Sequence, residues 1–89
     1  MIKLLVLSDD QILITQIEEV GSEMGEPDCK LTNPFVVKDG NLEPWLFEVT
    51  NQNVFMIHSD KIITITDPKP SLLEKYEQLT KWNFTPTYN

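Results

Sequence analysis

The sequence predicts one small domain that is mainly β, with a single α-helix at its C-terminal end. With 89 residues the chain is too short for two hydrophobic cores. Short apolar, β-branched runs follow one another closely through residues 1–66, and this pattern favours five or six strands in a small barrel or sandwich. Beyond residue 70 the apolar residues recur at helical spacing instead. A domain of this size buries only about 60–65% of the surface that its unfolded chain exposes, so association between copies would stabilise it.

Two strands joined by a turn are predicted at the N-terminal end. Residues 2–7 form an almost continuous apolar run, which is typical of a buried strand. The segment Ser8–Gln11 has the chemistry of a turn, because short Ser and Asp side chains bond to nearby backbone groups. Residues 12–20 are rich in isoleucine and favour a second strand that returns along the first. A helix is the alternative for this segment, since three of its apolar residues also fit a period of 3.6.

Loops and short strands alternate through the middle of the chain. Residues 21–28 combine two glycines and a proline with acidic residues and predict a loop. A strand is predicted over residues 29–37, interrupted by Asn33-Pro34. Because proline cannot donate to a sheet, we expect this strand to lie at an edge or to contain a bulge. A turn is predicted at residues 38–41. Three further extended segments are predicted, at residues 45–49, 54–57 and 61–66.

The C-terminal helix has the strongest local signals. Ser71 and Glu74 have the spacing of a capping box, in which each side chain satisfies an orphan backbone amide. Four apolar residues then recur at helical spacing and form one stripe over two turns. We therefore predict a helix over residues 71–82 within a single domain of residues 1–83, followed by a flexible tail at residues 84–89.

Charge and composition exclude several functional classes. Fourteen acidic residues face seven lysines, which gives a formal net charge of -7, and the chain has no arginine. Binding of double-stranded DNA is not expected, because such proteins carry a basic surface and use arginine for phosphate contacts. One cysteine and one histidine allow no intramolecular disulfide and no Cys/His zinc site, so we expect neither a metal nor a cofactor. The N-terminal apolar run is too short for a signal peptide and no stretch could span a membrane. We therefore expect a cytoplasmic protein in a reducing compartment.

Catalysis has little support in the sequence. Cys29 and His58 are the only residues that could make a thiol nucleophile and its base, which must lie within hydrogen-bond reach. A lone cysteine, however, is usually a small buried hydrophobic residue. The adjacent carboxylates at 9–10 and 18–19 would point to opposite faces of a strand, and no glycine-rich phosphate loop is present. We predict that the chain is not an enzyme.

Residues 55–65 form a strand–turn–strand unit that carries the only histidine at its turn. An apolar triplet, Phe55-Met56-Ile57, precedes His58-Ser59, and Asp60-Lys61-Ile62 leads into the next apolar strand. A histidine in this place offers a flat ring for base stacking, although it is also a residue that tolerates unusual turn geometry. The unit resembles the second Sm motif of the Sm-like (LSm/Hfq-type) proteins, with His58-Ser59 in the place of the family's Arg-Gly.

Two other segments add to this resemblance. Residues 5–14 look like the opening hairpin of the first Sm motif, and residues 67–76 are similar to a pattern in small Sm-like proteins of marine bacteriophages (cyanophages). The sequence departs from the family at Thr15, where Sm-like proteins have a glycine that lets the second strand bend. It also departs at His58-Ser59, and its helix follows the strands instead of preceding them.

The resemblance implies a strongly bent five-stranded antiparallel Sm-like barrel over residues 1–66, with the C-terminal helix covering one opening. Its open edges would pair between copies and close a homo-oligomeric ring of about five to seven subunits. The implied function is binding of single-stranded RNA through pore-facing loops, in the cytosol of the host if the protein is phage-encoded. The residues implied for this contact are His58, Ser59, Lys61 and Asp28. The alternative is a protein-interaction or assembly module that kept the ring and lost nucleic-acid binding, as the acidic charge and absent arginine favour.

Overall fold

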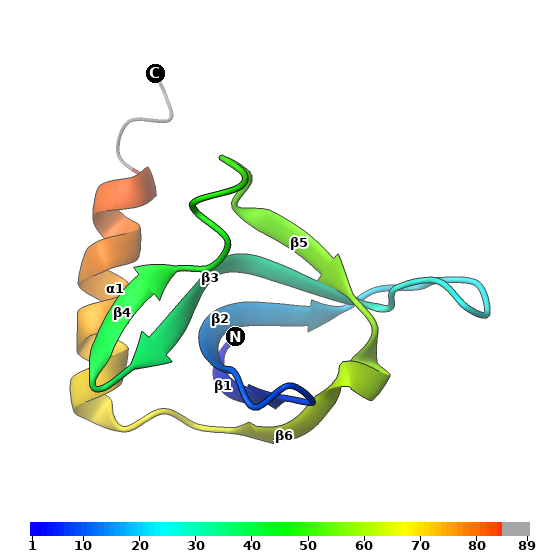
Figure 1. Cartoon of the computed structure of the whole chain (residues 1–89), viewed down its shortest axis with the longest axis horizontal. Coiled ribbons are helices and arrows are strands. Elements are labelled where there is room, and N and C mark those ends of the chain that lie inside the picture. Colours follow the sequence, from blue (N-terminus) through cyan, green and yellow to red (C-terminus); the bar gives the residue numbers. More distant parts are fainter. Residues whose placement is uncertain (85–89) are drawn as a thin grey trace.

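The structure, a computed structural model, describes residues 1–84 and consists of an open, antiparallel six-stranded sheet with one C-terminal helix (Figure 1). The elements are β1 (Ile2–Leu7), β2 (Ile12–Glu19), β3 (Cys29–Lys38), β4 (Asn41–Pro44), β5 (Val54–Ile57), the 3₁₀ turn η1 (Ser59–Lys61), β6 (Ile62–Thr66) and α1 (Pro70–Phe84). The strand order is β4-β3-β2-β1-β6, and β5 also pairs with β3. The mainly β fold with a C-terminal helix is therefore confirmed. The sheet has six strands, one of the two numbers that the strand pattern predicts, instead of the five that the resemblance implies, and it is not closed.

The additional strand comes from a tight hairpin after β3. Asp39 and Gly40 both have positive φ, +52° and +80°, the backbone geometry that a two-residue hairpin turn requires. This turn, predicted from the sequence, folds β4 back onto the second half of β3. The predicted extended segment at residues 45–49 is wrong. The backbone N–H groups of Val49 and Thr50 both donate to the Leu46 carbonyl, so this segment curls into a turn instead of joining the sheet.

The long strand β3 lies inside the sheet, and a bulge accommodates its proline. Its first half pairs with β5 and its second half with β4, while β2 lies along its other side. Ile14 pairs with Phe35 and Gln16 with Thr32, so that Thr15 alone faces two residues, Asn33 and Pro34. The bulge confirms one of the two predicted ways of placing the proline, and the edge position is excluded.

The bend at Thr15 does not need a glycine. Thr15 is fully buried, and its hydroxyl donates to the Thr32 carbonyl oxygen at 3.2 Å across the bulge. Leu13, Ile14 and Thr15 are buried in succession, which breaks the usual alternation of a strand with one exposed face. Both faces of the sheet are therefore covered at this point.

Two hydrophobic cores lie on opposite faces of the sheet. Leu13 and Val36 belong to the first core, whereas their strand neighbours Ile14 and Phe35 belong to the second. Successive residues of a strand point to opposite faces, so the two cores have the sheet between them. The first core lies within the curve of the sheet, where Leu5, Leu7 and Leu31 complete it.

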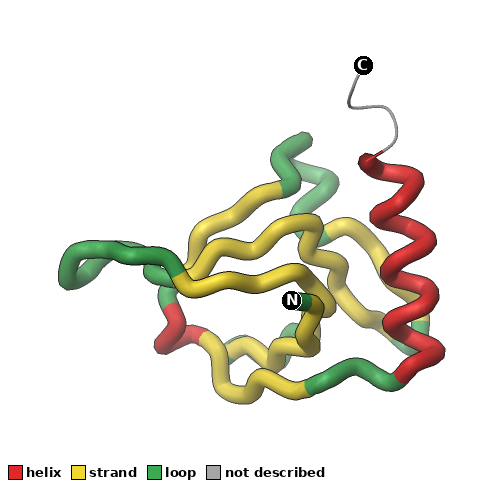
Figure 2. Tube along the Cα trace, turned by 180° about the vertical axis from the view of Figure 1, so that it is seen from behind, coloured by secondary structure: helices red, strands yellow, loops and turns green. Residues whose placement is uncertain are grey.

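Helix α1 covers the second core, and Tyr76 anchors it there. The ring of Tyr76 packs edge-on against Phe35, with ring centroids 5.6 Å apart, and its hydroxyl donates to the Asn33 carbonyl oxygen at 2.9 Å. The helix thus packs on a face of the open sheet, as Figure 2 shows from behind, and the expectation that it covers a barrel opening is wrong. The physical reason is that the outer faces of β1, β2 and β3 carry apolar side chains that need cover of their own.

The predicted helix is present, with different ends. The amides of Leu72 and Leu73 both donate to the Lys69 carbonyl, so Lys69 precedes the helix and Pro70 opens it. Proline is favoured at a first helical position, and Ser71 lies inside the first turn instead of capping it. At the other end α1 includes Phe84, where the tail was predicted to begin. The rest of that predicted tail, residues 85–89, lies outside the described residues. Within residues 1–84, no helix is long and apolar enough to cross a membrane.

Candidate functional site at the η1 turn

The candidate site is built from two segments that are far apart in the sequence. Cys29 and Ile57 are partners in the pairing of β3 with β5, so the residues next to them, Asp28 and His58, come together at the end of these strands. Residue 28 ends the acidic loop and residue 58 begins the short η1 connection to β6. Both segments lie at the end of the sheet away from α1 (Figures 1 and 2). The fold therefore brings all four predicted site residues to one end of the molecule.

Asp28 and Ser59 are joined by two hydrogen bonds. The backbone N–H of Ser59 donates to Asp28 Oδ1 at 2.7 Å, and the Ser59 hydroxyl donates to Asp28 Oδ2 at 2.8 Å. These bonds hold the pKa of the Asp28 carboxyl below its ordinary value, and the nearby His58 adds a smaller effect in the same direction. His58 makes no side-chain bond to the start of η1, so Asp28 caps this turn from another segment. Both carboxylate oxygens are thus engaged within the protein.

His58 has an ordinary extended backbone, with φ −81° and ψ 135°. Its place in the chain is therefore not explained by tolerance of unusual turn geometry, and the alternative offered for it from the sequence is wrong. Its side chain is half-buried beside the Asp28–Ser59 pair.

Lys61 contributes differently from the other site residues. Its backbone carbonyl accepts a hydrogen bond from the Ser8 amide at 2.8 Å, and its own amide donates to the His58 carbonyl at 3.1 Å. These bonds tie η1 to the turn between β1 and β2, while the Lys61 side chain is exposed. The result is a hydrogen-bonded turn that carries one imidazole, one hydroxyl and one ammonium group.

Cys29 lies next to this site, and its thiol is a weak nucleophile. The side chain is buried in β3, and burial raises the pKa of its thiol, with the Asp28 and Glu19 carboxylates adding to the effect. A thiol with a raised pKa stays protonated at neutral pH and is a weak nucleophile. The Cys29–His58 pair considered from the sequence therefore lacks an activated thiol. Among residues 1–84 no three Cys, His, Asp or Glu side chains are grouped closely enough to hold a metal ion.

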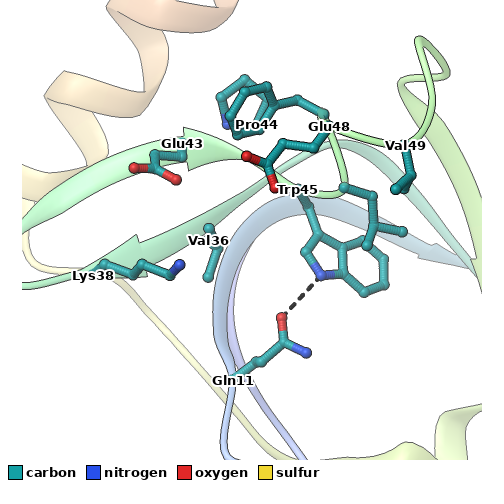
Figure 3. A pocket seen from close by; sticks show the side chains of 10 residues that line it. Gln11, Val36, Lys38, Glu43, Pro44, Trp45, Glu48 and Val49 are labelled. Carbon is teal, nitrogen blue, oxygen red and sulfur yellow. Dashed lines mark hydrogen bonds between the residues drawn. The ribbon is translucent and has the colours of Figure 1, made fainter.

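The structure also shows a hollow that the sequence did not predict, beside the β4–β5 connection (Figure 3). It has a volume of about 270 Å³, and Trp45 is the largest side chain in its wall. The Trp45 indole N–H donates to Gln11 Oε1 at 3.0 Å, and its ring packs against Phe55 with centroids 5.3 Å apart. Beyond Trp45 the chain exposes Phe47 and Val49, which is 78% exposed. The signal for this hollow in the sequence is the apolar cluster after Pro44, although the composition of that cluster predicts a strand.

The fold and the η1 site define a small, mainly β protein with an open sheet and a polar turn at one end. The chain belongs to a family of unknown function, DUF6561, which matches it over residues 1–81. No curated protein matches the chain.

Proposed function

We propose that this chain is a non-enzymatic module that assembles with copies of itself, through the open edges of β5 and β6, into a ring of the Sm-like type. The third open edge, that of β4, carries Glu43 and Pro44, which are unfavourable for pairing with another strand. The observation that carries the proposal is that β5 and β6 each leave one edge unpaired. Among the described elements β5 pairs only with β3, and β6 only with β1, so each strand has one unpaired edge. Such an edge is a template for pairing with another chain.

Both strands carry exposed apolar side chains. Met56 on β5 is 46% exposed, and Ile65 on β6 is 55% exposed. Neither strand contains proline, lysine or another charged residue, which are the usual means of blocking an open edge. A bulge at Ile63 twists the start of β6 and leaves Thr64–Thr66 in regular register with β1. The two edges are thus similar in length and in chemistry.

Pairing of β5 with β6 of the next copy favours a ring over a simple dimer. The two edges belong to different strands, so a contact between them is heterologous and leaves one free edge on each outer copy. Repetition of that contact closes a ring when the rotation between copies permits. The η1 turn joins β5 to β6 within each copy, so every subunit would present His58 and Lys61 close to these contacts. An Sm-like barrel completed by its neighbours would have this arrangement.

Native mass spectrometry and light scattering test the assembly. We expect the wild type to form one closed oligomer of a single mass, and Met56→Lys and Ile65→Lys each to break it by placing a charge on one edge. Val49→Lys is the matched control, because Val49 is more exposed than either edge residue and lies in the β4–β5 connection. The control should assemble normally. A wild type that is monomeric at all concentrations contradicts the proposal.

A mixing experiment tests which edges meet. Met56→Lys leaves the β6 edge intact, whereas Ile65→Lys leaves the β5 edge intact. A mixture of the two variants should therefore form one-to-one heterodimers and stop there, because each pair has only one usable contact. Homodimers of either variant alone would mean that like edges pair, and the heterologous ring would be wrong.

A second candidate function is binding of single-stranded RNA at the η1 turn. The observation in its favour is that the half-buried His58 ring and the exposed Lys61 ammonium lie on one short turn. A ring for stacking and a positive charge are the two groups that such binding uses. Against it, the Asp28 carboxylate occupies the Ser59 hydroxyl and the chain has a net charge of -7.

Fluorescence anisotropy with labelled U-rich and A-rich oligonucleotides separates the two functions. Phosphate contacts are strongest at low salt, so the measurement belongs there. RNA binding that weakens in both His58→Ala and Lys61→Ala would support the second candidate. Absence of binding by the assembled wild type would leave assembly as the function.

A further inference from the structure

A second unpredicted hollow lies beside the β3 bulge, at the far end of β5 from η1. Its volume is about 400 Å³, within the range of about 300–1,000 Å³ that is usual for small-molecule sites. The residues that line it are Asn33, Pro44, Trp45, Phe47, Thr50, Asn51, Gln52 and Asn53. Four of these carry a carboxamide, two are aromatic and none is ionisable, so we call this hollow the carboxamide pocket.

Asn33 in this pocket has a buried polar group with no partner. The residue is only 3% exposed, and its Nδ2 has no hydrogen-bond partner among the described residues. Its backbone groups are satisfied, because the N–H donates to the Asn53 carbonyl at 2.7 Å and the C=O accepts from the Tyr76 hydroxyl. A buried amide nitrogen without an acceptor destabilises a fold. Because this nitrogen is closed off from solvent, a molecule in the hollow can supply its acceptor only when the carboxamide rotates towards the hollow, a torsion with broad, soft minima.

The backbone conformation of Asn33 suits either asparagine or glycine. Its φ of +53° lies in the left-handed region, which asparagine adopts more readily than most residues with a side chain. Glycine would adopt the same conformation without burying an unpaired amide, so replacement by glycine tests the carboxamide separately from the backbone.

The two aromatic side chains of the pocket differ in how firmly they are held. Trp45 is held by its hydrogen bond to Gln11 and its contact with Phe55. Phe47, in contrast, is 54% exposed at the mouth. Between them Leu46 has φ +62°, a strained conformation for a branched residue, which turns the chain so that both rings reach the same hollow.

We propose that the carboxamide pocket binds a neutral saccharide. The C–H face of a sugar ring packs on an aromatic side chain, and each sugar hydroxyl both donates and accepts hydrogen bonds. A carboxamide also offers one donor group and one acceptor, and it can turn to present either end. Sugar hydroxyls can therefore satisfy a carboxamide such as that of Asn33 in either orientation, whereas the Gln52 amide nitrogen already donates to the Val54 carbonyl oxygen at 2.7 Å.

Charge argues against a nucleotide in this pocket. A base that enters as part of RNA brings phosphates with it, and the lining offers no lysine in a chain whose net charge is -7. A neutral sugar brings no charge that the protein would repel. The proposal does not depend on ring assembly, since every lining residue comes from one copy.

The test is a titration followed by ¹⁵N-resolved NMR, in which side-chain amides give signals of their own. The probes are maltose, cellobiose, lactose and diacetylchitobiose, each up to about 10 mM, which is tenfold above a weak dissociation constant of 1 mM. Adenosine and uridine form a second arm. We expect at least one saccharide to shift the side-chain amide signals of Asn33 and of Asn51–Asn53, and the nucleosides to leave them unchanged.

Two variants and a control complete the test. Phe47→Ala should abolish the shifts, and Asn33→Gly should weaken binding about two- to tenfold, the size of one neutral hydrogen bond. Asn33→Gly should nevertheless melt no lower than the wild type, because it removes the orphaned amide at a backbone position that suits glycine. Val49→Ala, in the same connection but outside the pocket lining, should bind normally. The assembly mass should be unchanged in all three variants, so failure of this site is distinguishable from failure of the ring.

Several outcomes would overturn the proposal. Saccharides that shift no pocket signal exclude it, as do shifts that persist in Phe47→Ala. Nucleosides that bind where saccharides do not would identify the pocket as a base-binding site instead.

Discussion

The hydroxyl of Tyr76 is the point at which α1 is attached to the bulge in β3, and its removal gives a quantitative test of the fold. Tyr76→Phe keeps the ring against Phe35 and deletes only the O–H that donates to the Asn33 carbonyl at 2.9 Å. One buried hydrogen bond contributes about 1 kcal/mol, and a carbonyl left unsatisfied raises the cost of its loss to about 1–2 kcal/mol. In a domain of this size such a loss lowers the melting temperature by about 5–15 °C.

Urea and thermal unfolding at one fixed protein concentration measure this change, because assembly would otherwise shift the apparent stability. Thr80→Val is the matched control. Thr80 is also buried on α1, but its hydroxyl donates at 3.0 Å to the Tyr76 carbonyl of its own helix. Loss of such a local bond changes helix stability little. If Tyr76→Phe were as stable as Thr80→Val, the tie between α1 and the bulge would not stabilise the fold as we infer.

The same tyrosine predicts a loss of stability in alkali. Burial raises the pKa of Tyr76 from 10.0 to about 12. A raised pKa means that the folded state holds its proton where the unfolded state has lost it. The contribution of the neutral phenol is therefore complete below about pH 10 and is lost as the pH rises towards 12. The unfolding free energy of the wild type should fall in this window, and that of Tyr76→Phe should fall less.

Three further predictions concern the site and the sheet. Hydrogen bonds from Ser59 lower the pKa of the Asp28 carboxyl. The contribution of this carboxylate to stability is therefore present above the ordinary carboxyl pKa and is lost as the pH falls through the lowered pKa. In acid unfolding, the stability of Asp28→Asn should depend less on pH across this range than that of the wild type. Thr15→Gly should lower the free energy of unfolding, measured in urea, by about 1–2 kcal/mol, because it removes a fully buried side chain and its hydrogen bond across the bulge. An unchanged free energy of unfolding would mean that the bend prefers glycine. Lys3→Ala should change stability by less than about 1 kcal/mol, and less still at high salt, because its 2.6 Å contact with Asp67 lies at the surface; a larger loss would show that this pair fastens the segment between β6 and α1.

The strands with strong patterns were predictable, and the reason is local. The apolar run of residues 2–7 and the β-branched run of residues 62–66 have the composition of strands, and Asp39-Gly40 has the geometry of a hairpin turn. The segment 12–19 could have been a helix on periodicity, but pairing with both β1 and β3 decides for a strand. Cross-strand hydrogen bonds and burial outweigh a weak local preference.

The errors lie where more than one local backbone arrangement is possible. Residues 45–49 have strand-like composition, yet the backbone amides of Val49 and Thr50 donate to the Leu46 carbonyl within one turn. The start of α1 is set by Pro70 and the Lys69 carbonyl, although Ser71 has the spacing of a cap. In both places several local solutions satisfy the same backbone groups, and the surrounding packing selects one.

The same division applies to the candidate site. His58, Ser59 and Lys61 are neighbours on one turn, so the sequence alone placed them together, and the resemblance added Asp28 to the set. That Asp28 caps η1 through both of its oxygens depends on the pairing of β3 with β5. The carboxamide pocket gave no signal at all, because residues 33 and 44–53 meet only through the bulge.

By itself, the sequence determined the class of this protein: a small, acidic, mainly β domain that ends in an amphipathic helix. These properties follow from composition and from periods of two and 3.6 residues, which depend on near neighbours alone. The tertiary structure decided that the sheet stays open, that α1 covers its outer face, and that one bulge joins Thr15, Asn33 and Tyr76. Contacts between segments 15 to 60 residues apart cannot be inferred from local patterns, because many arrangements of the same strands bury the same apolar residues and only side-chain packing distinguishes them.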